Sequence, residues 1–308
     1  MDPDELTVKA FVRHLRHENK SDRTVQGYCE AVRQLSDFLG DDRELLDATR
    51  DDIRDFTADL LASRSPATAA NRFRSLQAFY KFAVADDLAE VNPTAGLRAP
   101  VVPEKPVPVV PLPQLRTLLD ACQVKGKPPT QRNRQWHEHF TGRRDEAMIR
   151  LMLEPGGMRV AEVTGLTLGD VDFENDTVLV VGKGRRVRAI PFGYKSGRAL
   201  TRYLAMRAKH GHTRLPNLWL AQKGAMTISG VAQMLERRCA QAGIPRIRPH
   251  QLRHTAADMW LAESGGDETS AMRLFGWKSR AMLQRYGSSN ADKRARDAAR
   301  KLSLGDKL

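Results

Sequence analysis

Apolar positions in the first hundred residues recur at the spacing of amphipathic helices, and residues typical of helix ends separate them. The four expected segments run from about residue 6 to 17, from Ser21 to Gly40, from Thr49 through Leu60, and from Ser65 to Asp86. Serine and threonine at the starts are good N-caps, and glycine at residue 40 is a good stop. The pattern therefore predicts a small four-helix bundle.

A proline-rich stretch follows the predicted bundle. Ala99–Pro113 holds six prolines and shows no polar helical face, so we expect a semi-extended linker. The sequence thus predicts a helical domain at residues 1–98, a linker at 99–113 and a second domain at 114–308.

The second domain is expected to be mainly helical with one small antiparallel sheet. Apolar runs at Val171–Phe173, Thr177–Val181 and Val187–Pro191 predict strands, with a glycine-rich hairpin turn between the last two. Gln123–Arg143 is polar, basic and rich in helix breakers, so we expect a loop insertion there. The expected helices are Leu115–Cys122, Asp145–Leu153, Ser196–His210, Ile228–Ala242, His250–Glu263, Thr269–Leu274 and Asp292–Lys301.

Composition and charge narrow the functional classes. The chain has 308 residues, of which 41% are hydrophobic, which is enough for real cores and argues against disorder. Its net charge is +13, and the charge is unevenly distributed along the chain. Residues 1–100 carry 14 basic and 18 acidic side chains, whereas residues 101–308 carry 36 basic and 19 acidic side chains. A strongly basic second half favours a polyanionic partner, most often nucleic acid.

Cysteine usage and hydropathy predict a cytoplasmic protein that does not enter a membrane. The three cysteines, Cys29, Cys122 and Cys239, form no CxxC pair, which argues against disulfides and a cysteine-ligated metal. The apolar runs are far shorter than a membrane span, and the acidic N-terminus has no signal-peptide core.

Three separate segments carry candidate chemistry. After the Gly156-Gly157 turn, Arg159 and Glu162 share one helix face. Lys183 stands between two glycines at the hairpin tip, where it can approach a ligand closely. His250 and Arg253 also share a helix face and can both donate to one phosphate.

Each of these signals has an ordinary structural alternative. Arg159 and Glu162 could form a surface ion pair, and Lys183 could be a solvated hairpin lysine. His250 and His254 have the spacing of a metal-binding pair, although no HExxH glutamate accompanies them. Trp277 and Tyr286 taken singly are more often packing residues.

The ordered set of motifs resembles the signature of the tyrosine recombinase, or phage integrase, family. The matching segments are Gly-Met-Arg-Val-x-Glu, Gly-Lys-Gly, His-x-Leu-Arg-His-Thr and Phe-Gly-Trp-x-Ser, followed by Tyr286, within about residues 145–290. Trp277 stands where many members have histidine, and Ala161 where serine is common. The resemblance implies a SAM-like core-binding bundle followed by a mixed α+β catalytic domain.

The resemblance also implies roles for the matching residues. Tyr286 would attack a phosphodiester of double-stranded DNA at a specific recombination site and form a 3′-phosphotyrosyl link, without metal or nucleotide cofactor. Lys183 would protonate the leaving 5′-oxygen. Glu162 would orient the arginines and the histidine of the site rather than touch DNA. The groups that would stabilise the transition state are Arg159, His250, Arg253 and Trp277.

The family's assembly would be a homotetramer that passes through a four-way junction, with the helix in residues 290–308 docking into the next subunit. Further DNA contacts are expected from basic residues of the bundle and the hairpin. A type IB topoisomerase-like activity and an inactive DNA-binding regulator are alternatives; a metal-dependent nuclease lacks its carboxylate cluster. The expected DNA-contacting residues are Arg64, Arg72, Arg74, Lys81, Arg185, Arg186 and Arg188.

Overall fold

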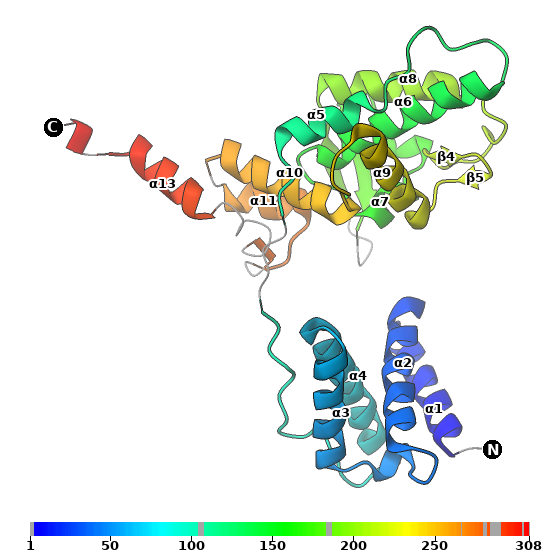
Figure 1. Cartoon of the computed structure of the whole chain (residues 1–308), viewed down its shortest axis with the longest axis vertical. Helices are drawn as coiled ribbons and strands as arrows, with labels where there is room; N and C mark the ends of the chain where they lie inside the picture. Colours follow the sequence, from blue (N-terminus) through cyan, green and yellow to red (C-terminus); the bar gives the residue numbers. More distant parts are fainter. Residues whose placement is uncertain are drawn as a thin grey trace. The chain divides into compact units, whose positions relative to one another are not determined.

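The computed structural model describes residues 3–103, 108–182, 187–265, 267–279, 282–283, 291–303 and 305–307. It forms two compact units, Met1–Lys105 and Pro106–Leu308 (Figure 1). The expected site residues Lys183, Arg185, Arg186 and Tyr286 lie outside the described residues.

The N-terminal unit is the predicted bundle, and the predicted caps are present. The Ser21 side chain accepts from the amide of Thr24, and Ser65 accepts from the amide of Thr68. Thr49 and Asp52 form a reciprocal capping box. The elements are α1 (Pro3–His17), α2 (Asp22–Leu39), η1 (Leu45–Asp47), α3 (Arg50–Ser63) and α4 (Pro66–Ala85).

Aromatic side chains fill the centre of this bundle. The Phe11 ring lies 5.3 Å from the ring of Phe79 and 5.3 Å from that of Phe82. Tyr80 is fully buried, and its hydroxyl donates to the carbonyl oxygen of Leu45 at 2.7 Å. Such packing needs no partner protein, so the bundle has a core of its own.

The C-terminal unit is helical around a three-stranded antiparallel sheet of order β1-β2-β3, in which Val181 pairs with Val187 at the end of the β2–β3 hairpin that adjoins the turn. Long helices α6 and α8 pack along one another at the end of this unit opposite α11 (Figure 1). The elements are α5 (Leu112–Asp120), α6 (Arg134–Leu153), α7 (Val160–Gly165), η2 (Leu168–Asp170), β1 (Val171–Asp172), β2 (Thr177–Val181), β3 (Val187–Pro191), α8 (Tyr194–Arg207), β4 (Leu220–Ala221), β5 (Gly224–Ala225), α9 (Ile228–Ala242), α10 (Pro249–Glu263), α11 (Glu268–Phe275), α13 (Ala291–Lys301) and η4 (Gly305–Lys307).

The prediction of a loop across Gln123–Arg143 is wrong for its second half, because α6 already begins at Arg134. This part of α6 is anchored by two large buried aromatic side chains, Trp136 and Phe140. Trp136 stacks on Phe140 at 5.3 Å, and Phe140 stacks on His210 at 4.6 Å. Two aromatic residues one turn apart hold the helix in the core, although the segment is polar on average.

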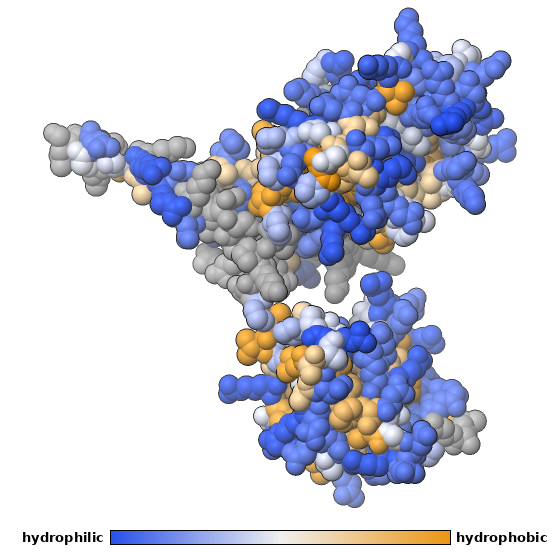
Figure 2. All heavy atoms as spheres, viewed as in Figure 1, coloured by the Kyte–Doolittle hydropathy of each residue, from blue (hydrophilic) through white to orange (hydrophobic). Residues whose placement is uncertain are grey.

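Hydrophilic residues cover most of the visible face of the C-terminal unit (Figure 2). Among the helices that the structure describes, none is both long and apolar enough to cross a bilayer. Cys29, Cys122 and Cys239 are all buried free thiols.

Candidate active site

The turn that precedes Arg159 depends on two glycines. Gly156 and Gly157 have φ angles of +116° and +35°, which side chains disfavour. A Cβ on Gly157 would lie 2.8 Å from the Phe275 ring and 3.2 Å from Cγ of Arg253. The glycines therefore let this turn pack directly against α10 and the end of α11. They place Arg159 at the N-cap of α7.

Glu162 joins two arginines beneath the surface. Its Oε1 accepts from Arg159 Nη1 at 2.9 Å, and its Oε2 accepts from the Arg159 amide at 2.7 Å. Arg188 on β3 donates to both carboxylate oxygens, at 3.0 and 2.8 Å. Glu162 thus fixes the Arg159 side chain, which is 39% exposed, and links it to the sheet.

Arg188, for which a contact with DNA stays a prediction, makes several contacts within the chain. Besides its two bonds to Glu162, its Nε donates to the carbonyl oxygen of Leu274 at 3.0 Å, and its side chain is only 12% exposed. Every guanidinium nitrogen of Arg188 therefore has a protein acceptor. The residue braces Glu162 and the end of α11.

The electrostatics of Glu162 give a test of this bracing. Burial by itself raises the Glu162 pKa, but hydrogen bonds from Arg188 and Arg159 outweigh burial and lower the pKa from 4.5 to about 2. Because the folded chain protonates less readily than the unfolded chain, the stabilisation is complete above about pH 5 and is lost as the pH falls toward 2. That shift corresponds to about 3 kcal/mol.

Glu162→Gln is therefore expected to lower the free energy of unfolding of the C-terminal unit by about 3 kcal/mol at pH 7. The difference from wild type should shrink by about 1 kcal/mol at pH 4, where part of the carboxylate's advantage is lost. Urea unfolding followed by tryptophan fluorescence measures this, because all four tryptophans lie beyond the linker. Glu174→Gln, at an exposed carboxylate, is the matched control. A difference that stays constant with pH would contradict the assignment.

Arg253 lies on α10 and is 1% exposed. Its Nη1 donates to the carbonyl oxygen of Gly157, and its Nη2 donates to that of Phe275 at 2.6 Å. The guanidinium carbon also lies 5.7 Å from the centre of the Phe275 ring. Arg253 therefore ties α10 to the turn before Arg159 and to the end of α11.

His250 and Trp277 occupy different environments. His250 is exposed in the first turn of α10, and its ring meets that of His254 edge to face at 4.6 Å. No third histidine, cysteine, aspartate or glutamate joins them as a metal-ligand group within the described ranges. Trp277 is 5% exposed and stacks on Phe275 at 4.8 Å.

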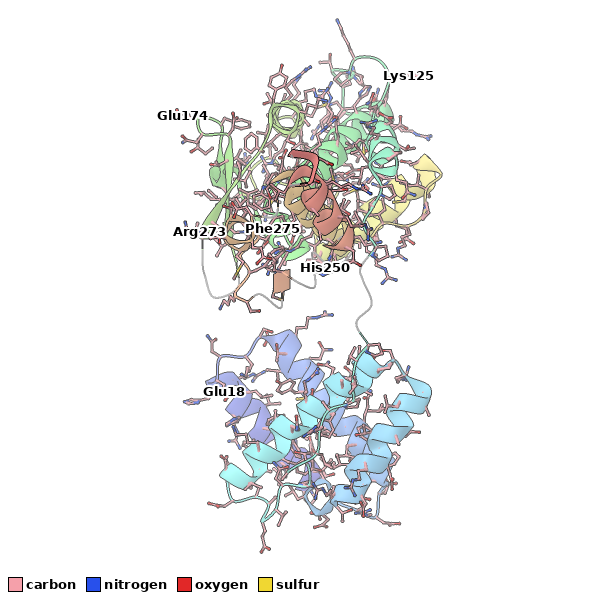
Figure 3. All side chains as sticks on the ribbon, turned by 90° about the vertical axis from the view of Figure 1, so that its left-hand side faces the viewer. Glu18, Lys125, Glu174, His250, Arg273 and Phe275 are labelled. Carbon is pink, nitrogen blue, oxygen red and sulfur yellow. The ribbon has the colours of Figure 1, made fainter. Side chains whose placement is uncertain are left out.

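A groove of about 840 Å³ brings several of these elements together. Arg159 and Trp277 line it, and so does Gly182, the residue that precedes Lys183. His250 and Arg253 do not line this groove, although α10 and α11 lie toward the same end of the unit (Figures 1 and 3). The structure therefore unites the base of the hairpin, the Arg159 turn and the Trp277 segment.

Sequence reasoning missed two cations of this groove. Arg273 and Lys278 are exposed side chains in its lining. Their signal in the sequence was their position beside the Phe-Gly-Trp motif. With Arg159 and Arg188 they make the groove suited to an anionic ligand.

The basic residues expected on the N-terminal unit do not share one environment. Arg64, Arg74 and Lys81 are exposed, and the last two lie seven residues apart on α4. Arg72 is instead 12% exposed, with an ion pair to Glu30 at 2.7 Å and a hydrogen bond to the carbonyl oxygen of Gly27. The Arg72 side chain therefore joins α4 to α2, and its predicted contact with DNA stays a prediction.

Sequence comparisons find similar proteins over nearly the whole chain. The profile described as the phage integrase family matches residues 114–293, and the one described as the phage integrase N-terminal SAM-like domain matches residues 8–90. Tyrosine recombinase XerC of Myxococcus xanthus is 30% identical over 289 residues, covering 91% of each chain. XerC of Bacillus subtilis is 31% identical over 292 residues, covering 91% of this chain and 90% of the relative.

Solved structures support the fold. The Tn1549 transposon integrase in complex with transposon right end DNA has a TM-score of 0.74 and 21% identity, covering 97% of this chain and 99% of its own. XerH site-specific recombinase bound to a palindromic difH substrate has a TM-score of 0.72 and 18% identity, covering 95% and 83%. The predicted combination of a SAM-like helical domain with a mainly helical domain containing small antiparallel sheets is thereby confirmed.

Proposed function

Because the chain belongs to the phage integrase family and is a tyrosine site-specific recombinase, we propose that it cuts and rejoins double-stranded DNA through the Tyr286 hydroxyl group. The observation that best supports the proposed site is the groove that unites Arg159, Trp277 and the base of the Lys183 hairpin. This groove gathers cations from segments far apart in sequence, as a phosphodiester requires.

The groove's cations suit the charge that develops during transesterification. As the Tyr286 oxygen bonds to phosphorus and the bond to the 5′-oxygen breaks, negative charge grows on the non-bridging oxygens. Arg159 is exposed enough to donate to them and is held in place by Glu162. A fixed guanidinium stabilises that charge without reorganising at the moment of reaction.

Proton transfers complete the step. A free phenol has a pKa of about 10, so Tyr286 must lose its proton in a cationic site, and we assign His250 as acceptor. Lys183 donates a proton to the leaving 5′-oxygen. The product holds a 3′-phosphotyrosyl bond and a free 5′-hydroxyl. One phosphoester replaces another, so the chemistry consumes no nucleotide.

Arg253 supports the proposed site from a buried position. Its bonds to the Gly157 and Phe275 carbonyl groups hold the Arg159 turn against the segment that leads to Trp277. Its permanent positive charge adds to the potential at the phosphate. We therefore assign Arg253 both a positioning and an electrostatic contribution.

DNA binding beyond the cleaved phosphate is assigned to cations on both units. Arg185 and Arg186 follow the hairpin lysine in the sequence, and Arg64, Arg74 and Lys81 are exposed on the bundle. Such contacts release counterions, so affinity should fall steeply with salt. Phosphate contacts of this kind position the protein rather than read the sequence.

We assign the C-terminal segment to subunit assembly. The described side chains of α13 are exposed, and Leu302 beyond it is 68% exposed. Ala295, Ala299 and Leu302 stay exposed in one chain and can be buried against a second chain. This supports a homotetramer linked by exchanged helices, which holds two DNA sites through a four-way junction.

Deletion of residues 291–308 tests the assembly and the recombinase activity together. The shortened chain should still form the covalent adduct on a nicked site but should lose recombinant products, because strand exchange needs partner subunits. Denaturing gels measure the adduct, and two-plasmid recombination in EDTA measures exchange. Full-length protein that relaxes supercoiled DNA as a monomer, without recombinants, would instead indicate a topoisomerase-like activity.

A further inference from the structure

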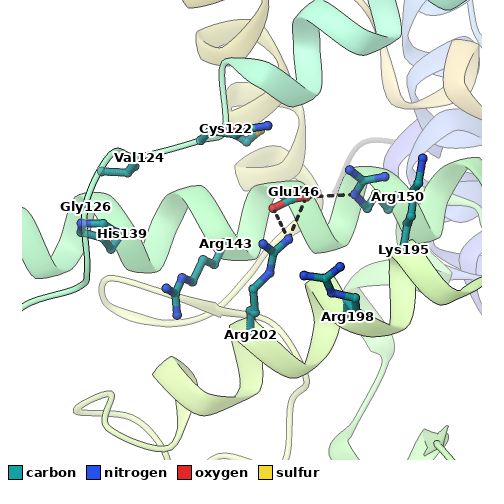
Figure 4. A pocket seen from close by; sticks show the side chains of 11 residues that line it. Cys122, Val124, Gly126, His139, Arg143, Glu146, Arg150, Lys195, Arg198 and Arg202 are labelled. Carbon is teal, nitrogen blue, oxygen red and sulfur yellow. Dashed lines mark hydrogen bonds and ion pairs between the residues drawn. The ribbon is translucent and has the colours of Figure 1, made fainter.

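A second cationic cavity lies between α6 and α8, apart from the groove. It measures about 450 Å³ and is lined by Arg143 and Arg150 of α6 and by Lys195, Arg198 and Arg202 of α8. Figure 4 shows the side chains of both helices around the space between them. Five cations around one small cavity repel each other, and a bound anion would offset this repulsion.

Among the described residues, Glu146 is the one carboxylate that lines this cavity. Glu146 is 11% exposed and pairs with Arg150 at 3.0 Å and with Arg202 at 3.0 Å. No carboxylate in the described part of the chain lies within ion-pair distance of Arg143, Lys195 or Arg198. The lining therefore keeps a strong positive excess after its internal pairs have formed.

The titration of neighbouring groups agrees with this excess. Burial and the charge of Arg202 lower the pKa of Arg143, although Glu146 opposes the shift. Burial and the charge of Arg143 lower the pKa of His139, which also lines the cavity. Burial disfavours any charge, but the contributions of Arg202 to the Arg143 pKa and of Arg143 to the His139 pKa indicate a positive potential in the cavity.

The third wall comes from the basic stretch to which the sequence assigned no role. Cys122–Gly126 crosses over α6 at Gly142, where an added Cβ would overlap the Cys122 carbonyl oxygen and lie 3.1 Å from Val124 Cγ2. This close crossing needs glycine. The fold thus builds a concave site, rather than leaving cations scattered on a helix surface.

We propose that this cavity binds a small oligophosphate. Guanidinium and ammonium groups on opposite walls can bind successive phosphates of one chain. Such a chain presents several negative charges in a compact volume. Among the described lining residues the apolar side chains are limited to Cys122 and Val124, and the one aromatic ring, that of His139, is only 2% exposed, so phosphates are favoured over a base. A DNA backbone is disfavoured because Lys125, beside the cavity, lies far from Arg273 and His250 in the C-terminal unit (Figure 3).

Such a ligand would stabilise the elements that support the active site. Glu154, at the end of α6, accepts hydrogen bonds from the Gly193 amide and the Ser196 hydroxyl at the start of α8. The same α6 end leads into the turn that carries Arg159. An anion that joins α6 and α8 should therefore raise the melting temperature of the C-terminal unit.

Calorimetric titration of the full chain with inorganic tripolyphosphate tests the proposal. The double variant Arg143→Gln/Arg198→Gln removes two cations but leaves both Glu146 pairs, and should raise the Kd at least about tenfold. Arg134→Gln, 95% exposed on the same helix, is the matched control and should change the Kd less than about twofold. Thermal unfolding without ligand checks that each variant is folded, and Lys195→Gln replaces the double variant if that one does not fold.

A second experiment measures the binding of duplex DNA by the same variants. The double variant should bind a duplex with the wild-type affinity and salt dependence. Unchanged tripolyphosphate binding in the folded variant, or no binding by wild type, would overturn the proposal. So would a loss of duplex affinity with a shallower salt dependence, which would assign the cavity to the DNA backbone.

Discussion

Tyr286→Phe is expected to abolish the covalent protein–DNA adduct while leaving DNA binding nearly unchanged. Phenylalanine keeps the ring but lacks the oxygen that attacks phosphorus, so no phosphotyrosyl bond can form. The expected loss in the cleavage rate is at least about 10³-fold. A nicked substrate measures this directly, because the released strand diffuses away and the adduct accumulates on a denaturing gel.

Two outcomes decide the assignment of the nucleophile. Tyr194→Phe, which changes an exposed tyrosine at the start of α8, is the matched control and should form adduct at the wild-type rate. Adduct formation by Tyr286→Phe at a comparable rate would mean that another side chain attacks. A native gel of the same mixture shows whether the variant still binds the site, so a folding defect is recognised.

Arg159→Ala is expected to slow cleavage of bound DNA by about 10²- to 10³-fold. In the proposed mechanism the exposed guanidinium beside the groove stabilises charge that appears only in the transition state, so DNA affinity should fall far less than the rate. Single-turnover cleavage at saturating protein separates the two effects. A loss of affinity with unchanged cleavage of bound DNA would rule out the transition-state role.

Arg159→Lys refines that test. Lysine keeps the charge but cannot donate to Glu162 and a phosphate with the planar geometry of guanidinium, so cleavage should recover only in part. Arg253 is less suitable for this experiment. Its removal leaves the carbonyl groups of Gly157 and Phe275 without a buried donor, and the resulting loss of stability would obscure the catalytic effect.

The sequence predicted the N-terminal bundle well because its signals are local. Ser21, Thr49 and Ser65 cap helices within three residues of themselves, so no tertiary contact is needed to recognise them. The start of α6 depends instead on the packing of Trp136 and Phe140 against His210, which lies just beyond the C-terminal end of α8. That contact joins distant segments and leaves no periodic pattern to read.

The active-site residues divide in the same way. Arg159 and Trp277 were found from motifs, and the groove contains both. The bracing role of Arg188 was not predictable, because it arises when β3 brings that side chain to Glu162 and Leu274. A count of basic residues cannot separate an arginine that contacts a ligand from one that supports its neighbour.

The attachment point of DNA in the adduct tests the central claim most directly. Trypsin should release a peptide that begins at Tyr286, and tandem mass spectrometry can locate the attached nucleotide on it. The account predicts a nucleotide joined through its 3′-phosphate to the Tyr286 oxygen, with a free 5′-hydroxyl on the other DNA end. Attachment to another residue, or through a 5′-phosphate, would contradict it.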